Sequence, residues 1–169
     1  TNIDQAPVAS LFRGFSAPVR VEYSQSKSEL LFLMANDSDG FNRWNACQKR
    51  VIDSVTQLMA DYGQDKTTEL DSDLLEAFRS LLTNPELDLA MVAKMLELPS
   101  QQFMAELLPK PVQVDAIYFG LNTLKKQLAE GLKPELSAVL ERIPLATEYA
   151  FNGEEMAKRS IRNVCLSYL

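Results

Sequence analysis

The sequence contains no histidine and only 2 cysteines among its 169 residues. Without histidine, the chain cannot form a Ser-His-Asp or Cys-His nucleophile, a histidine-ligated zinc site or a histidine pH switch. Cys47 and Cys165 each stand alone, outside any C-x-x-C pair or cysteine-rich framework. We therefore expect two buried, reduced thiols, which fit a cytoplasmic protein, and neither a zinc ribbon nor a disulfide scaffold.

Positive charge and long apolar runs are also scarce. The 17 Lys and Arg against 23 Asp and Glu give a net charge of -6, which disfavours binding to nucleic acid or to an anionic membrane surface. The longest apolar run, residues 30–35, is far shorter than the roughly 18 residues of a membrane-spanning helix. With 46% hydrophobic and 24% charged residues, the composition predicts one globular domain without a membrane span or a nucleic-acid partner.

The first 23 residues follow a different pattern from the rest. Pro7 and Pro18 enclose a stretch that contains Gly14, and apolar residues then occupy every second position from Val19 to Tyr23. A period of two predicts a half-buried strand. Because a strand needs a sheet partner and this period does not recur later, we interpret residues 1–23 as the trailing edge of a preceding β domain.

From residue 24 onward the apolar period is helical. Ser26 and Glu29 form a capping box that begins the first helix, which continues through Met34. Apolar stripes between capping residues and Gly or Pro stops predict seven more helices, near residues 41–62, 72–83, 88–98, 100–108, 114–130, 135–143 and 152–169. Residues 24–169 are thus predicted to be all-α, a superhelix-like stack of antiparallel helical hairpins without a regular sequence repeat.

Two acidic clusters are candidate metal sites. Asp37, Asp39 and Asn42 have the residue types of a calcium loop, but they lack its glycine spacing and its bidentate glutamate. Residues 69–73 hold three carboxylates at the predicted start of a helix, where the helix dipole favours negative charge. We interpret both clusters as helix N-terminal caps.

Two basic clusters are candidate ligand sites. Arg43 beside Trp44 could stack on a ligand, but Trp44 is in phase with the apolar stripe of its helix, which favours a core position, with Arg43 solvated or paired locally. Lys158, Arg159 and Arg162 could bind an anion, but Glu154 and Glu155 one turn earlier favour a solvated or interface-facing surface, with pairs from 154 to 158 and from 155 to 159. We therefore assign no catalytic, cofactor-binding or metal-ligating residue.

Several stretches, taken together and in this order, resemble the bacterial aminopeptidase N family, the alanyl aminopeptidases among the gluzincin zinc metallopeptidases. The similarity extends over nearly the whole chain, and its last stretch is the most specific. The stretches are FSAPV at 15–19 with EY at 22–23, LFLM at 31–34, FNRWNACQ at 41–48, LPS at 98–100 with MAEL at 104–107, and AKRSIRNVCL at 157–166.

The resemblance implies that residues 1–23 end the family's β-sandwich domain and that residues 24–169 begin its C-terminal helical domain. It implies a bacterial, cytoplasmic parent enzyme that uses zinc to remove N-terminal residues from peptides. The family's H-E-x-x-H zinc motif and its G-A-M-E-N motif have no counterpart here. The expected role of this segment is therefore to help enclose the active-site cavity, with the catalytic and remaining helical parts of the same chain as its partners.

Composition and periodicity alone also permit a free-standing α-helical adaptor that binds another protein. Thr1 in place of an initiator Met, and a last helix that reaches Leu169 without a stop signal, favour a piece of a longer chain instead. An H-E-x-x-H motif upstream in the reading frame would support the peptidase segment over the free-standing adaptor. Surfaces that face the rest of such a parent should be apolar and exposed, so we expect the excised segment to self-associate.

Overall fold

The computed structural model describes residues 6–15, 23–64, 66, 68–146 and 148–169. These residues form α-helices and one short 3-10 helix, and they contain no β-strand. The strand predicted over residues 19–23 lies outside the described residues except for Tyr23. The elements are the 3-10 turn η1 (Arg13–Phe15) and the helices α1 (Lys27–Asn36), α2 (Gly40–Ala60), α3 (Ser72–Thr83), α4 (Leu89–Leu96), α5 (Gln101–Leu107), α6 (Val114–Gly131), α7 (Lys133–Arg142) and α8 (Gly153–Tyr168).

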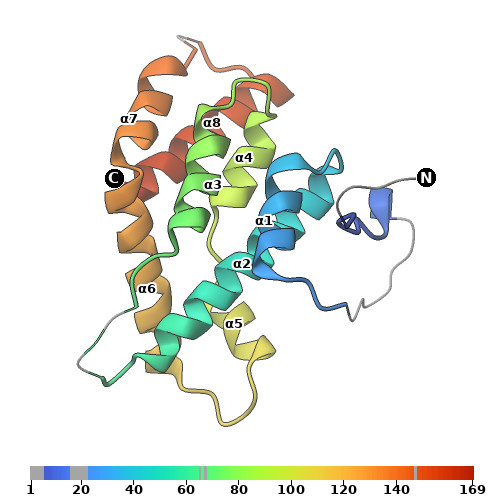
Figure 1. Ribbon diagram of the computed structural model, residues 1–169. Coiled ribbons are helices and arrows are strands. Elements are labelled where there is room, and N and C mark those ends of the chain that lie inside the picture. Colours follow the sequence, from blue (N-terminus) through green and yellow to red (C-terminus); the bar gives the residue numbers. More distant parts are fainter. Residues whose placement is uncertain (1–5, 16–22, 65, 67, 147) are drawn as a thin grey trace.

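Helix α2 is central to the arrangement (Figure 1). It packs against α1, from which only residues 37–39 separate it, and also against α4 and α6. Helix α8 packs against α4 and α7, and helix α3 packs against both α1 and α7. The shared core contains side chains from every helix, among them the fully buried Met34, Val51, Phe78 and Leu124. The predicted all-α architecture is confirmed for the described residues.

The helix ends follow from local sequence chemistry. The capping box of α1 is present, because the Ser26 hydroxyl accepts from the Glu29 amide while the Glu29 carboxylate accepts from the Ser26 amide. The stop predicted after α2 is confirmed, since Gly63 has φ 78°, a left-handed conformation that favours glycine. Pro134 lies in the first turn of α7, as its sequence position predicted.

Some positions predicted to face the core are exposed. Tyr62, Val114 and Met156 have exposed fractions of 45%, 61% and 46%. All three lie near an end of a predicted helix, and the Tyr62 ring still contacts Phe119 of α6, with 5.7 Å between the ring centroids. In α8 the side chain of Glu155 is buried instead, and Lys158 pairs with both Glu154 and Glu155.

The crossing of α2 and α6 requires a glycine. A Cβ atom added to Gly120 of α6 would lie 2.9 Å from the Val55 carbonyl oxygen of α2 and 3.0 Å from Met59 Cγ. The two backbones approach too closely at this point for any side chain. Gly120 thus sets the distance between the central helix and the layer formed by α6.

Candidate functional site

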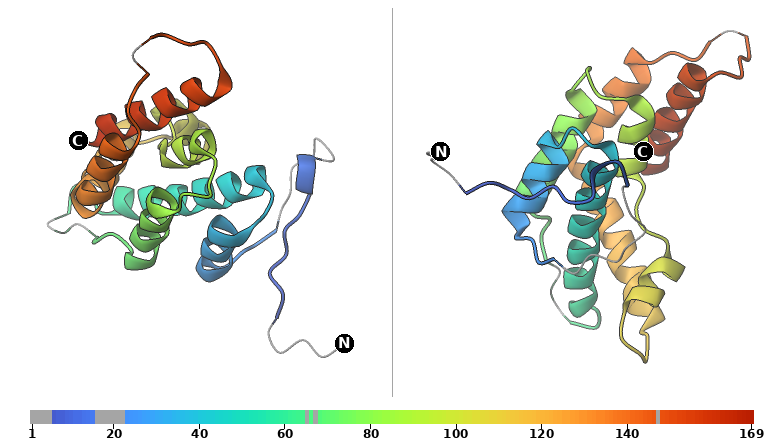
Figure 2. Two further views of the ribbon diagram at one scale, coloured as in Figure 1. Left: turned by 90° about the horizontal axis from the view of Figure 1, so that it is seen from above. Right: turned by 90° about the vertical axis from the view of Figure 1, so that its right-hand side faces the viewer.

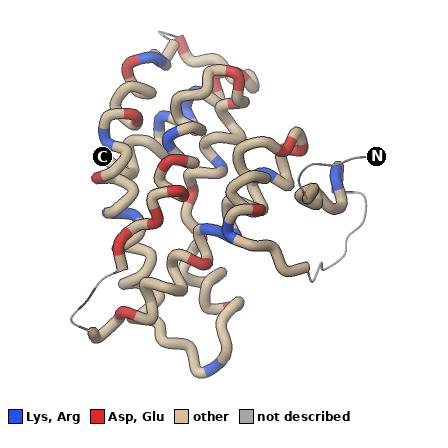
Figure 3. Tube along the Cα trace, in the orientation of Figure 1, with Lys and Arg blue, Asp and Glu red and all other residues tan. Residues whose placement is uncertain are grey.

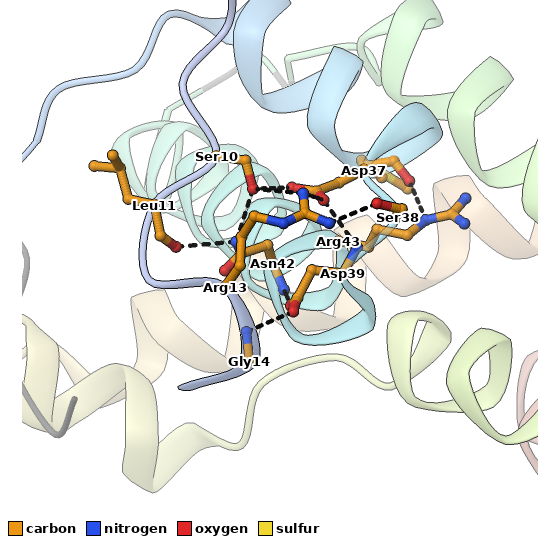
Figure 4. A network of polar contacts seen from close by, with 10 residues as sticks. Ser10, Leu11, Arg13, Gly14, Asp37, Ser38, Asp39, Asn42 and Arg43 are labelled. Atoms are coloured by element: carbon orange, nitrogen blue, oxygen red, sulfur yellow. Dashed lines mark hydrogen bonds and ion pairs between the residues drawn. The ribbon is translucent and has the colours of Figure 1, made fainter. Parts of the chain in front are cut away.

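Residues 10–14 are held against the turn that joins α1 to α2 (Figure 4). The left view in Figure 2 shows this N-terminal segment on the side of α1, away from the orange helices α6 and α7. We call the contact the N-terminal clamp, and it consists of Ser10, Leu11, Arg13, Gly14, Asp37, Ser38, Asp39 and Asn42.

Asp37 is the centre of the clamp. Its side chain is 1% exposed and accepts hydrogen bonds from the Ser10 hydroxyl at 2.5 Å and from Arg13 Nη1 at 2.8 Å. The Asp39 amide also donates to Asp37, at 2.9 Å. Because a buried carboxylate is stable only when it is paired and hydrogen-bonded, Asp37 depends on the N-terminal segment as much as the segment depends on it.

Asp39 belongs to the helix and to the clamp at the same time. One carboxylate oxygen caps α2 by accepting from the Asn42 amide at 2.9 Å, and the other accepts from the Gly14 amide at 2.7 Å. These two hydrogen bonds, in that order, lower the pKa of Asp39. The Asn42 side chain completes the contact by donating to Ser10 Oγ and to the Leu11 carbonyl.

The capping role predicted for this acidic cluster is confirmed for Asp39 only. Asp37 and Asn42 hold residues that lie 24 to 32 positions earlier in the chain. Sequence reasoning missed that role because a side chain's distant partner has no local signature. The sequence did offer one signal. Residues 37–42 hold more polar side chains than the start of α2 needs, because one side chain is enough to cap a helix.

Arg43 has partners within the chain, and Trp44 is partly buried. Arg43 donates to the carbonyls of Met34 and Ala35, at 3.1 and 2.9 Å, and so closes the C-terminal end of α1, as the local-pairing interpretation predicted. The Trp44 ring is only partly buried, and its centroid lies 5.7 Å from that of Phe41. Trp44 therefore borders the core without being enclosed by it.

Within the acidic residues 69–73, Asp71 pairs with a buried arginine, Arg50. Arg50 of α2 is 1% exposed, and its Nη2 donates to Asp71 at 2.9 Å, while Asp71 also caps α3 through the Asp73 amide. A cavity of about 430 Å³ is lined by residues that include Arg50 and Gln127, and Arg50 Nε and Gln127 Oε1 are buried without a hydrogen-bond partner. In the described part of the chain, no group of His, Cys, Asp and Glu is arranged to hold a metal ion.

The C-terminal basic cluster also has internal roles. Arg162 donates to the carbonyls of Leu140 and Ile143, at 2.5 and 2.6 Å, and Arg159 donates to the Ala150 carbonyl. In place of the ion pair predicted between residues 155 and 159, Glu155 pairs with Lys158 at 2.8 Å, and the Arg159 guanidinium lies over the Tyr149 ring, 5.0 Å from its centroid. Arg159 and Arg162 are half-buried, and their hydrogen bonds go to carbonyls at the end of α7 and in the loop that follows it.

Both cysteines are free and buried, which confirms the predicted reduced thiols. The Cys47 thiol donates to the Met95 carbonyl at 3.3 Å, and burial raises its pKa. Burial also raises the pKa of Cys165, to about 11. Neither thiol has the thiolate character of a nucleophile at neutral pH.

The charged residues do not mark a binding face. Basic and acidic positions are interspersed along the helices in the view of Figure 3. None of the described helices combines the length and the apolar character that crossing a lipid bilayer requires. The N-terminal clamp is one described contact between the helices and the residues that precede them, and the hydrogen bond from Lys49 to Gln25 is another.

Comparison with known proteins assigns the helical part of the chain to a protein family. The model of a family described as a domain of unknown function with ARM repeats, DUF3458_C, matches residues 27–169. The chain belongs to this family. The match begins at Lys27, the first residue of α1, so the clamp joins the DUF3458_C domain to residues that precede it.

The relatives of the DUF3458_C chain are aminopeptidases. It is 34% identical over 170 residues to aminopeptidase N of Escherichia coli, covering 99% of this chain and 19% of that protein. Aminopeptidase N of Haemophilus influenzae is 29% identical over 163 residues, covering 96% of this chain and 18% of that protein. The crystal structure of Legionella pneumophila aminopeptidase A in complex with aspartic acid superposes with a TM-score of 0.79 at 29% identity, over 99% of this chain and 20% of that one. The chain thus spans about a fifth of the length of these relatives.

Proposed function

We propose that the chain is a non-catalytic structural segment of a bacterial, cytoplasmic, zinc-dependent aminopeptidase, in which its helices help to enclose the active-site cavity. The observation that carries this proposal is the similarity to Escherichia coli aminopeptidase N over 99% of the chain. The family model of helical repeats begins only at residue 27. The residues before 27 therefore share the similarity to aminopeptidase N without belonging to the helical repeats.

The N-terminal clamp supports a division of the chain into two parts. In the proposed arrangement residues 1–23 end a β-sandwich domain and residues 24–169 begin the helical domain. The hydrogen bonds from residues 10–14 to Asp37 and Asp39 would then fix the orientation of one domain relative to the other. The residues of this chain do not fit a zinc site, because the chain has no histidine. The zinc ligands and the catalytic groups are assigned to other parts of the parent chain.

The test compares the full reading frame with the 169-residue chain. We expect the full-length protein to hydrolyse an alanyl anilide in a reaction that a metal chelator stops, and the 169-residue chain to be inactive. Hydrolysis by the isolated chain at an enzyme-like rate would contradict the proposal. A reading frame without H-E-x-x-H would contradict it as well and would favour the free-standing helical adaptor.

A further inference from the structure

Helices α2, α4 and α5 enclose an apolar groove that the N-terminal clamp does not use. Its volume is about 400 Å³, and we call it the Trp44 groove. Its apolar lining consists of Trp44, Ile52, Leu98, Pro99 and Phe103.

The groove is held open by its own polar contacts. Gln48 of α2 donates to the Glu97 carbonyl at 3.1 Å, which fixes the corner between α4 and α5 against α2. Ser100 caps α5 by accepting from the Phe103 amide, so the backbone that carries the Phe103 ring is fixed as well. A preformed groove binds without a large ordering cost, which favours its use as a docking site.

The chemistry of the groove selects an apolar occupant. Its two rim cations already have partners within the chain, since Lys94 pairs with Glu97 at 2.8 Å and Lys49 donates to Gln25 at 3.0 Å. Phe103 is 44% exposed, and Phe41, whose ring lies beside Trp44, is 41% exposed. Covering aromatic surface of this kind is favourable at roughly 25 cal/mol for each Å² removed from water.

The groove is continuous with the contact that the N-terminal segment makes. Ser10 and Leu11 contact α2 at Asn42, and Gln25 contacts it again at Lys49. These two contact points on α2 lie about two turns apart, and the second of them, Lys49, lines the groove. The segment that precedes α1 therefore contacts α2 at the clamp and again, through Gln25, at the rim of the groove.

We propose that the Trp44 groove docks an apolar edge of the unit that precedes residue 27 in the parent chain, so that the N-terminal clamp and the groove form one interdomain interface. This proposal rests on the proposed function, because that function supplies the preceding unit. The clamp provides directional hydrogen bonds to the buried carboxylate of Asp37 and the partly buried one of Asp39, and the groove provides the apolar area. An interface of this kind, with a desolvated aromatic centre beside a polar contact, resists rotation of one unit about the other.

The experiment is hydroxyl-radical footprinting of the full-length protein and of the 169-residue chain, read residue by residue by mass spectrometry. We expect oxidation of Trp44 and Phe103 to be roughly fivefold slower in the full-length protein, because the centre of an interface excludes solvent. Phe32 of α1, which is 52% exposed and lies outside the groove, is the matched internal control and should be oxidised equally in both. Equal oxidation of Trp44 and Phe103 in the two proteins would overturn the proposal.

A variant localises the effect. In the full-length protein, Phe103→Glu places a carboxylate in the groove, and it should restore Trp44 oxidation to the rate of the 169-residue chain, whereas Phe32→Glu should not. Restoration by both variants would overturn the assignment to this groove. Protection of Trp44 that rises with the concentration of the 169-residue chain would identify a second copy as the occupant and would also overturn it.

These outcomes separate the two proposals. A full-length protein that is an active, chelator-sensitive aminopeptidase but leaves Trp44 unprotected sustains the proposed function and refutes the groove assignment. A reading frame without an upstream peptidase motif refutes the proposed function itself. The comparison of wild-type proteins requires no variant, so misfolding of Phe103→Glu would not remove the test.

Discussion

The Arg13 guanidinium lies 2.8 Å from the Asp37 carboxylate, across 24 positions of the chain. The two partners are in different environments, because the Arg13 side chain is 48% exposed and that of Asp37 is 1% exposed. An ion pair with one exposed partner contributes little by attraction alone. Its importance comes from the hydrogen bond that it supplies to a buried carboxylate.

Removing the guanidinium should release the N-terminal segment. In Arg13→Met we expect amide exchange in residues 6–15 to approach that of an unstructured peptide, because Asp37 then has only Ser10 and the Asp39 amide as partners. The free energy of unfolding should fall by about 1 kcal/mol, the usual value for one hydrogen bond. Hydrogen exchange with mass spectrometry and urea unfolding measure the two effects, with the exposed Lys110→Met as control. Exchange of residues 6–15 that stays at the wild-type rate would show that the clamp does not depend on Arg13.

The clamp should also weaken in acid. Hydrogen bonds from the Asn42 and Gly14 amides hold the pKa of Asp39 below the ordinary range of an aspartate. A carboxylate whose pKa is lower in the folded state stabilises that state above its ordinary pKa, and this contribution is lost as the pH falls through the lowered value. The pKa values of Asp61, through Thr68, and of Glu155, through Lys158, are lowered as well. We therefore expect stability to decline below about pH 4.

The variant Asp39→Asn isolates the contribution of one charge to this acid sensitivity, because asparagine is also a good N-cap. It should destabilise the protein more at about pH 7 than at about pH 2.5, because the contribution of the Asp39 charge to wild-type stability is lost as the pH falls through its lowered pKa. Urea unfolding of the wild type and the variant at both pH values measures the difference in the free energy of unfolding. The low-pH measurement is the control for effects of the substitution other than the loss of charge. An equal loss of stability at both pH values would argue against a role for the charge.

The crossing of α2 and α6 should not tolerate a methyl group. Gly120→Ala gains about 1 kcal/mol of helix propensity. It also places Cβ 2.9 Å from the Val55 carbonyl oxygen, a backbone atom that cannot move aside, and overpacking of this kind costs about 1–3 kcal/mol. We expect a net loss of stability in urea unfolding. Gly153→Ala is the matched control, since nothing lies within 4 Å of its added Cβ, and it should be neutral or stabilising.

The contact between α8 and α4 depends on one hydroxyl. Tyr168 Oη donates to the Leu96 carbonyl at 2.7 Å in the core. Tyr168→Phe leaves that buried carbonyl without this donor, and we expect a loss of about 1–2 kcal/mol in thermal or urea unfolding. Tyr118→Phe removes a hydroxyl from a side chain that is 59% exposed and should have no measurable effect. If the two variants lose the same stability, the hydrogen bond to Leu96 does not hold α8 in place.

The isolated chain should self-associate. Large apolar side chains are exposed near its C-terminal end, among them Phe151 at 79%, Leu166 at 55% and Leu169 at 52%. Apolar surface of this extent favours contact with a second molecule. Light scattering over a range of concentrations should show a mass that rises above that of the monomer. A constant monomer mass at high concentration would contradict this prediction.

Much of the local structure was predictable from the residues alone. The capping box at Ser26, the stop at Gly63 and the first-turn Pro134 act within one or two helical turns of their own positions. Apolar periodicity identified the helices because burial of a face depends on spacing along one element. The absence of histidine is a property of the sequence by itself, and it excludes a histidine-ligated zinc centre in this chain whatever its fold.

The tertiary structure decided which polar groups meet. Asp37 and Arg50 lie in stretches that the sequence marks as a helix cap and a helix face, yet both are buried by elements far along the chain. Their pairing with Arg13 and Asp71, and the groove beside Trp44, arise only where separate helices come together. Local propensity depends on neighbours in sequence, whereas the pairing of a buried charge depends on neighbours in space, and only the folded chain defines those.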